Sequence, residues 1–578
     1  MTTLLRNGKV VNVFSERLIE EDVLIEDQTI IGTGDYSDFK ADTVIDCKGK
    51  FICPGFIDGH IHIESTMLLP AQFARTTLPH GTTTIIADPH EIANVMGIKG
   101  INYMLHASEG MPFNFFFMIP SCVPSTPSEE AYEPLGAKSI KHLYHNPRIL
   151  GLAEMMNFPG VIGKDRDVMQ KINDALSLDR LVDGHAPMLS GHGLDLYLSS
   201  SISSDHECSN MDEAVEKLEK GQWIMIREGT AARNLAALLP LFEEPYYTRC
   251  LLVTDDRHPA DLMKDGHIDN IIRKAIAAGK KPERVIRMAT IQAADRFGLK
   301  KTGAIAPGYF ADVLLLDNLE KVTVSDVFVR GKRVVEDGSV LPFTEPEIPS
   351  SLSGMALNSV KVNRIKLSDF AVPLPENMKK AIKADNTSAL RKKCHVIGVQ
   401  KGELLTDNLI EEIDFSKNGG IDVDRDILKV AVIERHHRTG HKGLGFIKGI
   451  QLKKGAIAST VSHDSHNIIV IGTNDRDMLF AAERIKKIGG GCVFVAEGKV
   501  IAEQALPVAG LMSTLTAEEV ARQNAEVRAS VHEYGVPQEI EPFMNMAFIS
   551  LPVIPYLKIT TLGLVDVATQ QNVSLFAE

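Results

Sequence analysis

Phe56-Ile57-Asp58-Gly59-His60-Ile61-His62-Ile63-Glu64 is an apolar, strand-like run that also carries polar side chains. Seven similar runs follow it, and most of them begin ~25–35 residues apart, the length of a strand plus a crossover helix. The eight runs cover residues 56–64, 83–88, 114–120, 149–155, 181–185, 201–206, 223–227 and 250–255. Their number and spacing predict an α/β fold, a (β/α)8 TIM barrel with a short helix after the sixth run.

Short strands with turns flank this barrel on both sides. Residues 1–54 and 300–342 share this pattern of short strands and turns, so we expect them to form one composite β domain. The barrel then spans residues 55–299, with closing helices at Ile271–Ala278 and Pro282–Phe297. A Pro-, Ser- and Gly-rich linker at Pro342–Gly354 precedes a C-terminal α/β domain over residues 355–578.

The composition is that of a soluble globular chain. The 578 residues are 44% hydrophobic and 24% charged, and 62 basic against 75 acidic side chains give a formal net charge of −13. Such an acidic balance argues against a protein held on nucleic acid by its overall charge. No apolar run approaches the ~18 residues of a membrane span, and the N-terminus carries no signal peptide. Seven cysteines without a C-x-x-C pair indicate reduced, mostly buried thiols in a cytoplasmic protein.

His60 and His62 lie two residues apart on the first run, so both side chains point to the same face. Two packed histidines would be the alternative if this pair stood alone. Further histidines and carboxylates stand where other runs end, which is where barrel enzymes carry catalytic groups. They are Asp88, His90, Glu91, Glu154, Asp183, His185, Asp205, His206, Glu207, Asp255 and Asp256. Since buried charges are costly unless they are paired or bound to metal, the convergence predicts a metal site.

Four histidines and two carboxylates suit two divalent first-row ions such as Mn, Fe or Zn, because no thiolate is present to favour a softer metal. A two-metal site lowers the pKa of a bound water and polarises an electrophile, so the prediction is a hydrolase. The signatures of small zinc deaminases, zincins, P-loops and nucleophile elbows are incomplete or absent in the sequence.

The stretch Pro54–His62 resembles the amidohydrolase superfamily signature, and Gly303–Val313 resembles the segment that usually follows its barrel. More specifically, the chain is similar to bacterial and archaeal adenine deaminases from end to end. The stretches that carry this similarity are His62–Ser65, Asp88–Gly97, Gly151–Met156, Met225–Gly229, Thr254–Arg257, Val461–Asn467 and Leu551–Pro555.

The resemblance implies hydrolytic deamination of adenine to hypoxanthine and ammonia, part of purine salvage. It also implies iron or manganese, and it places Glu154 where many two-metal relatives carry a carbamylated lysine. The predicted ligands are His60, His62 and Asp255 for one ion, His185 and His206 for the other, and Glu154 as the bridge. Asp256 is the alternative to Asp255, since either could face inward.

The predicted reaction is attack of an activated water on C6 of adenine, during which ring nitrogen N1 needs a proton. We assign that proton to Glu207, with Glu91 as the alternative, and the transfer of a proton to the leaving amine to Asp255. Orienting His206 is the other role open to Glu207. Contacts with the purine are predicted for Asp88, Arg227, Glu228, Asp256, His463 and His466. A salt bridge at the barrel rim is the alternative for Glu91, Arg227 and Glu228.

The turn Ser462–Asn467 is predicted to help close the barrel mouth over the substrate, because a lid excludes water. By its H-x-x-H spacing alone it could equally be a turn of the domain core.

Two other functions stay open from the residues alone. A cyclic-amide hydrolase of the dihydroorotase or imidazolone type would use the same ligands. A barrel that has lost catalysis would act as an interaction protein, but such a chain is expected to lack some ligands. We expect adenine as the small-molecule partner, no nucleic acid, no membrane, and a cytoplasmic homo-oligomer, a dimer.

Overall fold

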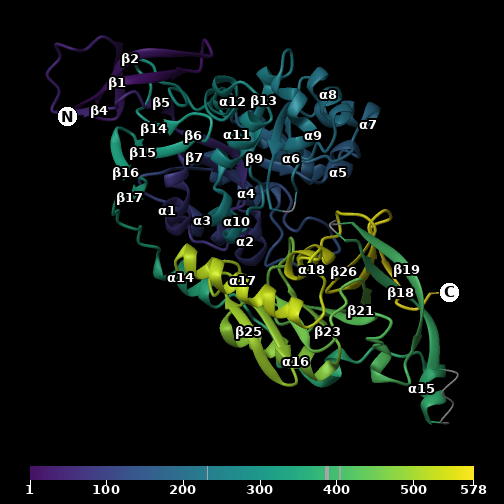
Figure 1. Cartoon of the computed structure of the whole chain (residues 1–578). Helices are drawn as coiled ribbons and strands as arrows, with labels where there is room; N and C mark the ends of the chain where they lie inside the picture. The colour runs from purple at the N-terminus through teal and green to yellow at the C-terminus, as the bar shows by residue number, and fades with distance from the viewer. Residues whose placement is uncertain (231, 384–389, 402–404, 578) are drawn as a thin grey trace. The chain divides into compact units, whose positions relative to one another are not determined.

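Eight parallel strands form the barrel in the computed structural model, which describes residues 1–230, 232–383, 390–401 and 405–577 (Figure 1). They lie in a five-stranded sheet of order β10-β9-β8-β7-β6 and a three-stranded sheet of order β11-β12-β13. The strands are β6 (Phe56–Ile61), β7 (Thr82–Ala87), β8 (Asn114–Ile119), β9 (Ile149–Met155), β10 (Leu181–Gly184), β11 (Ser204–Asp205), β12 (Trp223–Arg227) and β13 (Cys250–Val253). Each predicted run overlaps one strand, and the predicted fold class is confirmed.

Two seams join these two sheets. At the β6–β13 seam, Ile61 and Asp255 form a parallel bridge, and the Asp255 N–H donates to the His60 carbonyl oxygen over 3.0 Å. At the β10–β11 seam, the described residues form no ladder, although the Ser203 N–H donates to the Val182 carbonyl oxygen over 3.1 Å. Side chains must therefore contribute to the pairing at this second seam.

Three elements have bounds in the structure that differ from the predicted ones. The sixth run was expected to be extended over residues 201–206, but β11 has two residues and Ser201 has a left-handed backbone with φ of 65°. The first run ends as a strand at Ile61 and continues as a 3-10 helix over Ile63–Thr66. The second closing helix is interrupted at Ala289-Thr290, where Thr290 has φ of −136° and ψ of −96° and leaves the helical region.

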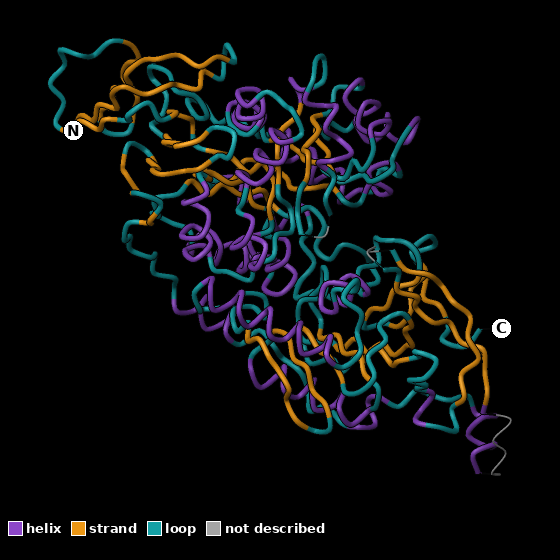
Figure 2. Tube along the Cα trace, viewed as in Figure 1, coloured by secondary structure: helices purple, strands orange, loops and turns teal. Residues whose placement is uncertain are grey.

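Helices follow the barrel strands along the chain (Figure 2), and several begin at a side-chain cap. Asp165 accepts the backbone N–H groups of Asp167 and Val168, and Asn210 accepts that of Glu213. The principal helices are α1 (Pro70–Thr77), α6 (Arg166–Ser177), α7 (Gly191–Leu198), α8 (Met211–Glu219), α11 (Ile268–Ala277), α12 (Pro282–Met288) and α13 (Ile291–Arg296).

Strands from both sides of the barrel build one nine-stranded sheet. Its main order is β17-β16-β15-β14-β5-β1-β2-β3, with β4 paired to β1. These strands are β1 (Thr2–Asn12), β2 (Arg17–Glu26), β3 (Thr29–Gly34), β4 (Thr43–Asp46), β5 (Phe51–Pro54), β14 (Val313–Asn318), β15 (Thr323–Val329), β16 (Lys332–Glu336) and β17 (Ser339–Val340). The antiparallel pair β5–β14 joins the two chain segments, with Val313 opposite Pro54 and Leu316 opposite Phe51.

The chain divides into two compact units. The barrel unit contains residues 1–89, 104–121 and 136–348, and the C-terminal unit contains residues 90–103, 122–135 and 349–578. Two short segments from the predicted barrel range thus belong to the C-terminal unit. The Tyr132 N–H donates to the Asn94 carbonyl oxygen over 2.7 Å and so joins the two segments to each other, and the Asn467 side chain donates through Nδ2 to the Glu130 carbonyl oxygen over 2.9 Å.

An eight-stranded mixed sheet of order β19-β18-β21-β20-β23-β22-β24-β25 forms the core of the C-terminal unit. The strands are β18 (Arg391–Val399), β19 (Thr406–Asp414), β20 (Leu428–Ile433), β21 (Lys442–Lys448), β22 (Ala456–Ser459), β23 (Ile468–Gly472), β24 (Gly491–Ala496) and β25 (Lys499–Ala505). A three-stranded sheet adds β26 (Leu557–Thr560), β27 (Gly563–Asp566) and β28 (Gln571–Val573). The helices of this unit include α2 (His90–Met96), α14 (Ser350–Leu357), α15 (Glu376–Lys383), α16 (Asp475–Ile488), α17 (Ala517–Glu533) and α18 (Pro542–Ile549).

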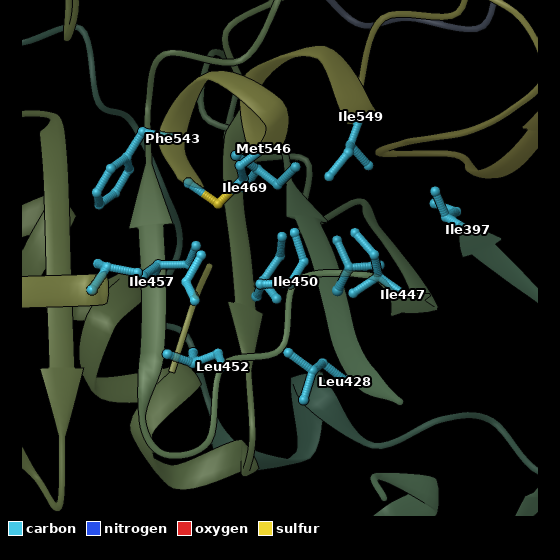
Figure 3. Close-up of a cluster of buried hydrophobic side chains, with 14 of the residues drawn as sticks. Ile397, Leu428, Ile447, Ile450, Leu452, Ile457, Ile469, Phe543, Met546 and Ile549 are labelled. Atoms are coloured by element: carbon cyan, nitrogen blue, oxygen red, sulfur yellow. The ribbon is translucent and has the colours of Figure 1, made fainter. Parts of the chain in front are cut away.

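Both faces of the large sheet are buried, because alternate residues of its central strands enter different hydrophobic clusters. Ile469 packs with residues of α17 and α18, while Ile468 packs with residues of α16. Figure 3 shows the first cluster, with Phe543 and Met546 of α18 against the side chains of the strands. The unit therefore has a helix–sheet–helix layering, typical of an α/β domain.

All seven cysteines have buried, free thiols, as their spacing predicts. Among the described residues, no helix has the length and apolar character needed to cross a bilayer.

Candidate active site

Glu154, at the end of β9, lies between two pairs of histidines in the barrel unit. Its Oε1 is 3.8 Å from His60 Nε2 and 3.4 Å from His62 Nε2. Its Oε2 is 2.7 Å from His185 Nδ1 and 3.2 Å from His206 Nε2. Each carboxylate oxygen thus faces one histidine pair, which is the arrangement that a bridging ligand requires.

Asp255 faces the first of these pairs. Its Oδ1 lies 3.1 Å from His62 Nε2 and 3.8 Å from His60 Nε2. Asp255 has a left-handed backbone with φ of 59°, which turns its side chain inward after β13 ends. The neighbouring carboxylate of Asp256 instead accepts a hydrogen bond from Ser65 Oγ over 2.5 Å. Of the two aspartates, Asp255 is the one beside the histidines.

The donor groups fit metal ions. His62 Nδ1 lies 3.0 Å from the Asp88 carbonyl oxygen; a proton on Nδ1 bonds there and leaves the Nε2 lone pair for a metal. His60 Nε2 is buried and has no hydrogen-bond partner among the described residues, although two carboxylates stand near it. Groups whose donor atoms lie close enough to share an ion are His60, His62 and Asp255; His60, Glu154 and His206; and His185, His206 and Glu207.

The electrostatics keep the carboxylates ionised. Burial acts to raise the pKa of Glu154, but hydrogen bonds with His185 and His206 hold that pKa well below its usual value. Burial lowers the pKa of His60 well below its usual value. For His206, burial also lowers the pKa, but Glu154 and Glu207 outweigh it and raise the pKa well above its usual value. A metal ion at His206 would have to displace its extra proton.

Arg227, the last residue of β12, connects two of the predicted catalytic carboxylates. Its Nη1 donates to Asp255 Oδ2 over 2.7 Å and also to Glu207 Oε1, and its Nη2 donates to Glu207 Oε2 over 3.0 Å. Its Nε donates to Asn234 Oδ1 over 3.1 Å. Burial acts to raise the pKa of Glu207, but Arg227 and the neighbouring histidines hold it well below its usual value. Arg227 therefore orients two anionic side chains.

Glu228 directly follows β12, and its side chain has other partners than Arg227. Its Oε1 accepts a hydrogen bond from Lys274 Nζ on α11 over 2.8 Å, and its Oε2 accepts the Leu235 N–H over 3.4 Å. These contacts match the rim salt bridge that was the alternative to purine binding for Glu228.

Glu91 binds two histidines within the C-terminal unit. Its Oε1 is 2.9 Å from His463 Nδ1, and its Oε2 accepts a hydrogen bond from His466 Nε2. The Ser462 N–H donates to His466 Nδ1 over 3.1 Å, so the ring carries its proton on Nε2 and uses it toward Glu91. His463 also stacks on Phe548, with ring centroids 4.5 Å apart. The two histidines of the predicted turn therefore hold a carboxylate that follows β7 by four residues in the chain.

Comparisons with known proteins show the family of this chain. The Amidohydrolase family matches residues 51–334, and the Adenine deaminase C-terminal domain matches residues 403–571. Adenine deaminase 2 of Carboxydothermus hydrogenoformans is 43% identical over 569 residues, 98% of this chain and 95% of the relative. The chain belongs to the adenine deaminase family. Adenine deaminase of Thermosipho africanus is 45% identical over 582 residues, 100% of this chain and 97% of that protein.

The solved structures that are similar to this chain share less of its sequence. An enamidase has 18% sequence identity and a TM-score of 0.46, with 60% of this chain and 100% of that chain covered. Dihydropyrimidinase from Brevibacillus agri has 17% identity and a TM-score of 0.46, with 59% and 96% covered.

The sequence analysis gave no partner to three buried aspartates that stand next to the proposed ligands in the adenine deaminase barrel. Asp58 bonds His267 Nε2 over 3.1 Å, and Asp183 accepts Arg296 Nη2 over 2.5 Å. Asp205 accepts Lys217 Nζ over 2.9 Å. Each aspartate lies on a strand and stands one or two positions before a proposed histidine ligand, which is His60, His185 or His206. This repeated position of an aspartate before a histidine was visible in the sequence. The basic partner of each aspartate could not be inferred from it, because the partners lie elsewhere in the chain.

Glu129 is a second buried carboxyl group of the C-terminal unit, and Ser125 Oγ donates a hydrogen bond to it. Burial and the nearby charge of Asp464 raise the pKa of Glu129 to about 8. Since the folded state favours the protonated form, this stabilisation is complete below the ordinary glutamate pKa of 4.5 and is lost as the pH rises through about 8.

We expect Glu129→Gln to remove this pH dependence, because the amide does not titrate. The Tm of the variant relative to that of the natural protein should rise between about pH 5 and about pH 8. Thermal unfolding followed by circular dichroism at the two pH values measures it. Glu412→Gln, at an exposed position of β19, is the control and should show little change at either pH. A Tm difference that falls with pH in Glu129→Gln would contradict the assignment.

Proposed function

We propose that this chain hydrolyses adenine to hypoxanthine and ammonia with two divalent metal ions. The observation that carries the proposal is the position of Glu154, with one oxygen toward His60 and His62 and the other toward His185 and His206. Relatives named adenine deaminase, 41–45% identical over nearly the whole chain, support adenine as the substrate.

The first ion would be held by His60, His62 and Asp255, the second by His185 and His206, with Glu154 shared between them. Imidazole and carboxylate donors without a thiolate suit manganese or iron, and zinc is the further choice. When bound, the ions supply a water of lowered pKa and polarise the electrophile. The work of the protein is to hold these donors in place and to move protons.

Glu207 and Asp255 are the proposed proton carriers. Both begin ionised beside Arg227, so each accepts a proton before it donates one. Glu207 takes the first proton of the attacking water and passes it to N1 of adenine as C6 becomes tetrahedral. Asp255 takes the second and delivers it to the C6 amine, which leaves as ammonia. The two protons of water thus end on N1 and on ammonia, and its oxygen remains on C6.

Glu91 is the alternative proton carrier, and His463 and His466 would then act through it. Hydrogen bonds from both imidazoles favour its ionised form, because they offset the cost of burying the charge. In this proposal the two histidines orient a carboxylate, in place of the direct purine contacts expected from the sequence.

A metal-reconstituted activity screen tests the reaction. The protein, stripped with a chelator and reloaded with Mn²⁺, Fe²⁺ or Zn²⁺, should release ammonia from adenine and leave adenosine, guanine and cyclic amides unchanged. Turnover of a cyclic amide in place of adenine would favour the dihydroorotase type of reaction. No turnover of any substrate by the fully loaded protein would favour a non-catalytic barrel.

Replacement of the bridge should remove one ion. Glu154→Gln loses the negative charge between the histidine pairs, so we expect one metal equivalent in place of two and loss of most activity. Metal analysis after gel filtration, together with the ammonia assay, measures both quantities. Two tightly bound equivalents with full turnover in this variant would refute the bridging role.

Replacement of the proposed N1 proton carrier should separate metal content from turnover. Glu207→Gln should keep two equivalents and lose turnover by ~10²–10⁴-fold, the usual contribution of general acid–base catalysis. Glu219→Gln, at the exposed end of α8, is the matched control and should keep full turnover. If Glu207→Gln loses activity only in proportion to lost metal, Glu207 orients His206 and carries no proton.

A further inference from the structure

Lys217 is a fully buried lysine on α8, and each of its three ammonium hydrogens has an acceptor. Its Nζ lies 2.8 Å from the Ala186 carbonyl oxygen, 2.9 Å from Asp205 Oδ2 and 2.8 Å from Glu213 Oε1. Lysine is almost never fully buried unless it is paired. The complete set of partners indicates that this position is built to hold a cation.

Asp205 connects Lys217 to the backbone beside two predicted ligands. Its Oδ1 accepts the Ala186 N–H over 2.9 Å, and its Oδ2 accepts the Glu207 N–H over 3.2 Å. Ala186 directly follows His185, and Asp205 directly precedes His206. Both backbone groups of Ala186 are therefore held by the Asp205–Lys217 pair, and the same pair holds the chain on both sides of His206.

This clamp lies at the β10–β11 seam, where the described residues form no ladder. β11 has two residues, and its ladder pairs them only with β12, Ser204 with Trp223 and Asp205 with Ile224. Regular backbone pairing therefore leaves the separation between the ends of β10 and β11 weakly determined. Beside the Ser203–Val182 backbone bond and the bonds of the Ser204 hydroxyl to Gly184 and Asp183, the ion pair adds a connection at the ends of the two strands, where a ladder holds neighbouring strands within each of the two barrel sheets.

We propose that Lys217 and Asp205 are positioning residues that set the separation of His185 and His206 and thereby the affinity for the second metal ion. This inference rests on the two-metal site proposed above. Neither side chain needs to touch substrate or metal, because both act through the backbone of Ala186 and Glu207. Without Lys217, the buried carboxylate of Asp205 would lose its nearest cation and its contacts would rearrange.

Lys217→Met removes the ammonium group and keeps an unbranched apolar side chain. Titration of the metal-free protein with Mn²⁺ should show two tight equivalents in the natural protein. In the variant, one equivalent should stay tight and the dissociation constant of the other should rise ~10–100-fold, the usual effect of losing an outer partner of a metal ligand. Excess Mn²⁺ should restore kcat with little change in KM for adenine.

Lys429→Met is the matched control. Lys429 is also fully buried, and its Nζ donates to the Phe370 carbonyl oxygen over 2.9 Å and to Asp475 Oδ1 over 2.5 Å, but it belongs to the C-terminal unit. This variant should lose thermal stability and yet bind both Mn²⁺ equivalents with natural affinity. If both lysine variants lose the second Mn²⁺ equivalent, the cause is general destabilisation of the protein, and the proposal is wrong.

Asp205→Asn keeps the side-chain shape and tests the other partner, including the case in which Lys217→Met does not fold. This variant should also weaken the binding of the second Mn²⁺ equivalent alone. Natural affinity for both equivalents in Asp205→Asn would overturn the positioning role while leaving the proposed reaction intact. A natural protein that binds fewer than two equivalents would instead overturn the two-metal site itself, and the positioning role with it.

Discussion

The buried carboxylate of Glu154 between four imidazoles is the interaction on which the barrel interior depends. Removing such a charge from water costs several kcal/mol even after relaxation, so its neighbours must compensate it. Glu154 lies on β9, and three other strands supply the compensating groups, since β6 carries His60, and His185 and His206 follow β10 and β11 directly. A parallel barrel brings these strand ends to one rim, and no local segment of the chain could assemble the same set.

The other buried charges near the proposed ligands also need partners. Arg227 neutralises Asp255 and Glu207, while His267, Arg296 and Lys217 bond three aspartates that stand just before the proposed ligand histidines. Two of these aspartates, Asp58 and Asp205, lie at the seams where the two barrel sheets meet. Each accepts backbone N–H groups there, Asp58 from Thr254 and Asp205 from Ala186. Charges that support the site thus also replace missing strand pairing.

In the C-terminal unit, too, buried polar groups have neighbours that fix their charge. Its sheet is covered by apolar side chains on both faces, and buried carboxyl groups lie in the two short segments that come from the barrel region of the sequence. There Glu91 has His463 and His466 as donors, while Glu129 lies near another carboxylate and is held neutral. Burial acts to raise the pKa of both glutamates, but hydrogen bonds with the two imidazoles hold that of Glu91 below its usual value, whereas the charge of Asp464 raises that of Glu129 further.

The sequence by itself determined the eight strands, their order and the residues at their ends, because strand periodicity and the spacing of crossover helices are local properties. It could not decide between Asp255 and Asp256, since the left-handed backbone of Asp255 that turns one of them inward has no signature in the sequence. The partners of Arg227, Glu91 and Lys217 were equally beyond it. Glu91 meets His463 and His466 across more than 370 positions. Only tertiary structure decides such pairs, because buried charges select partners by distance in space and not along the chain.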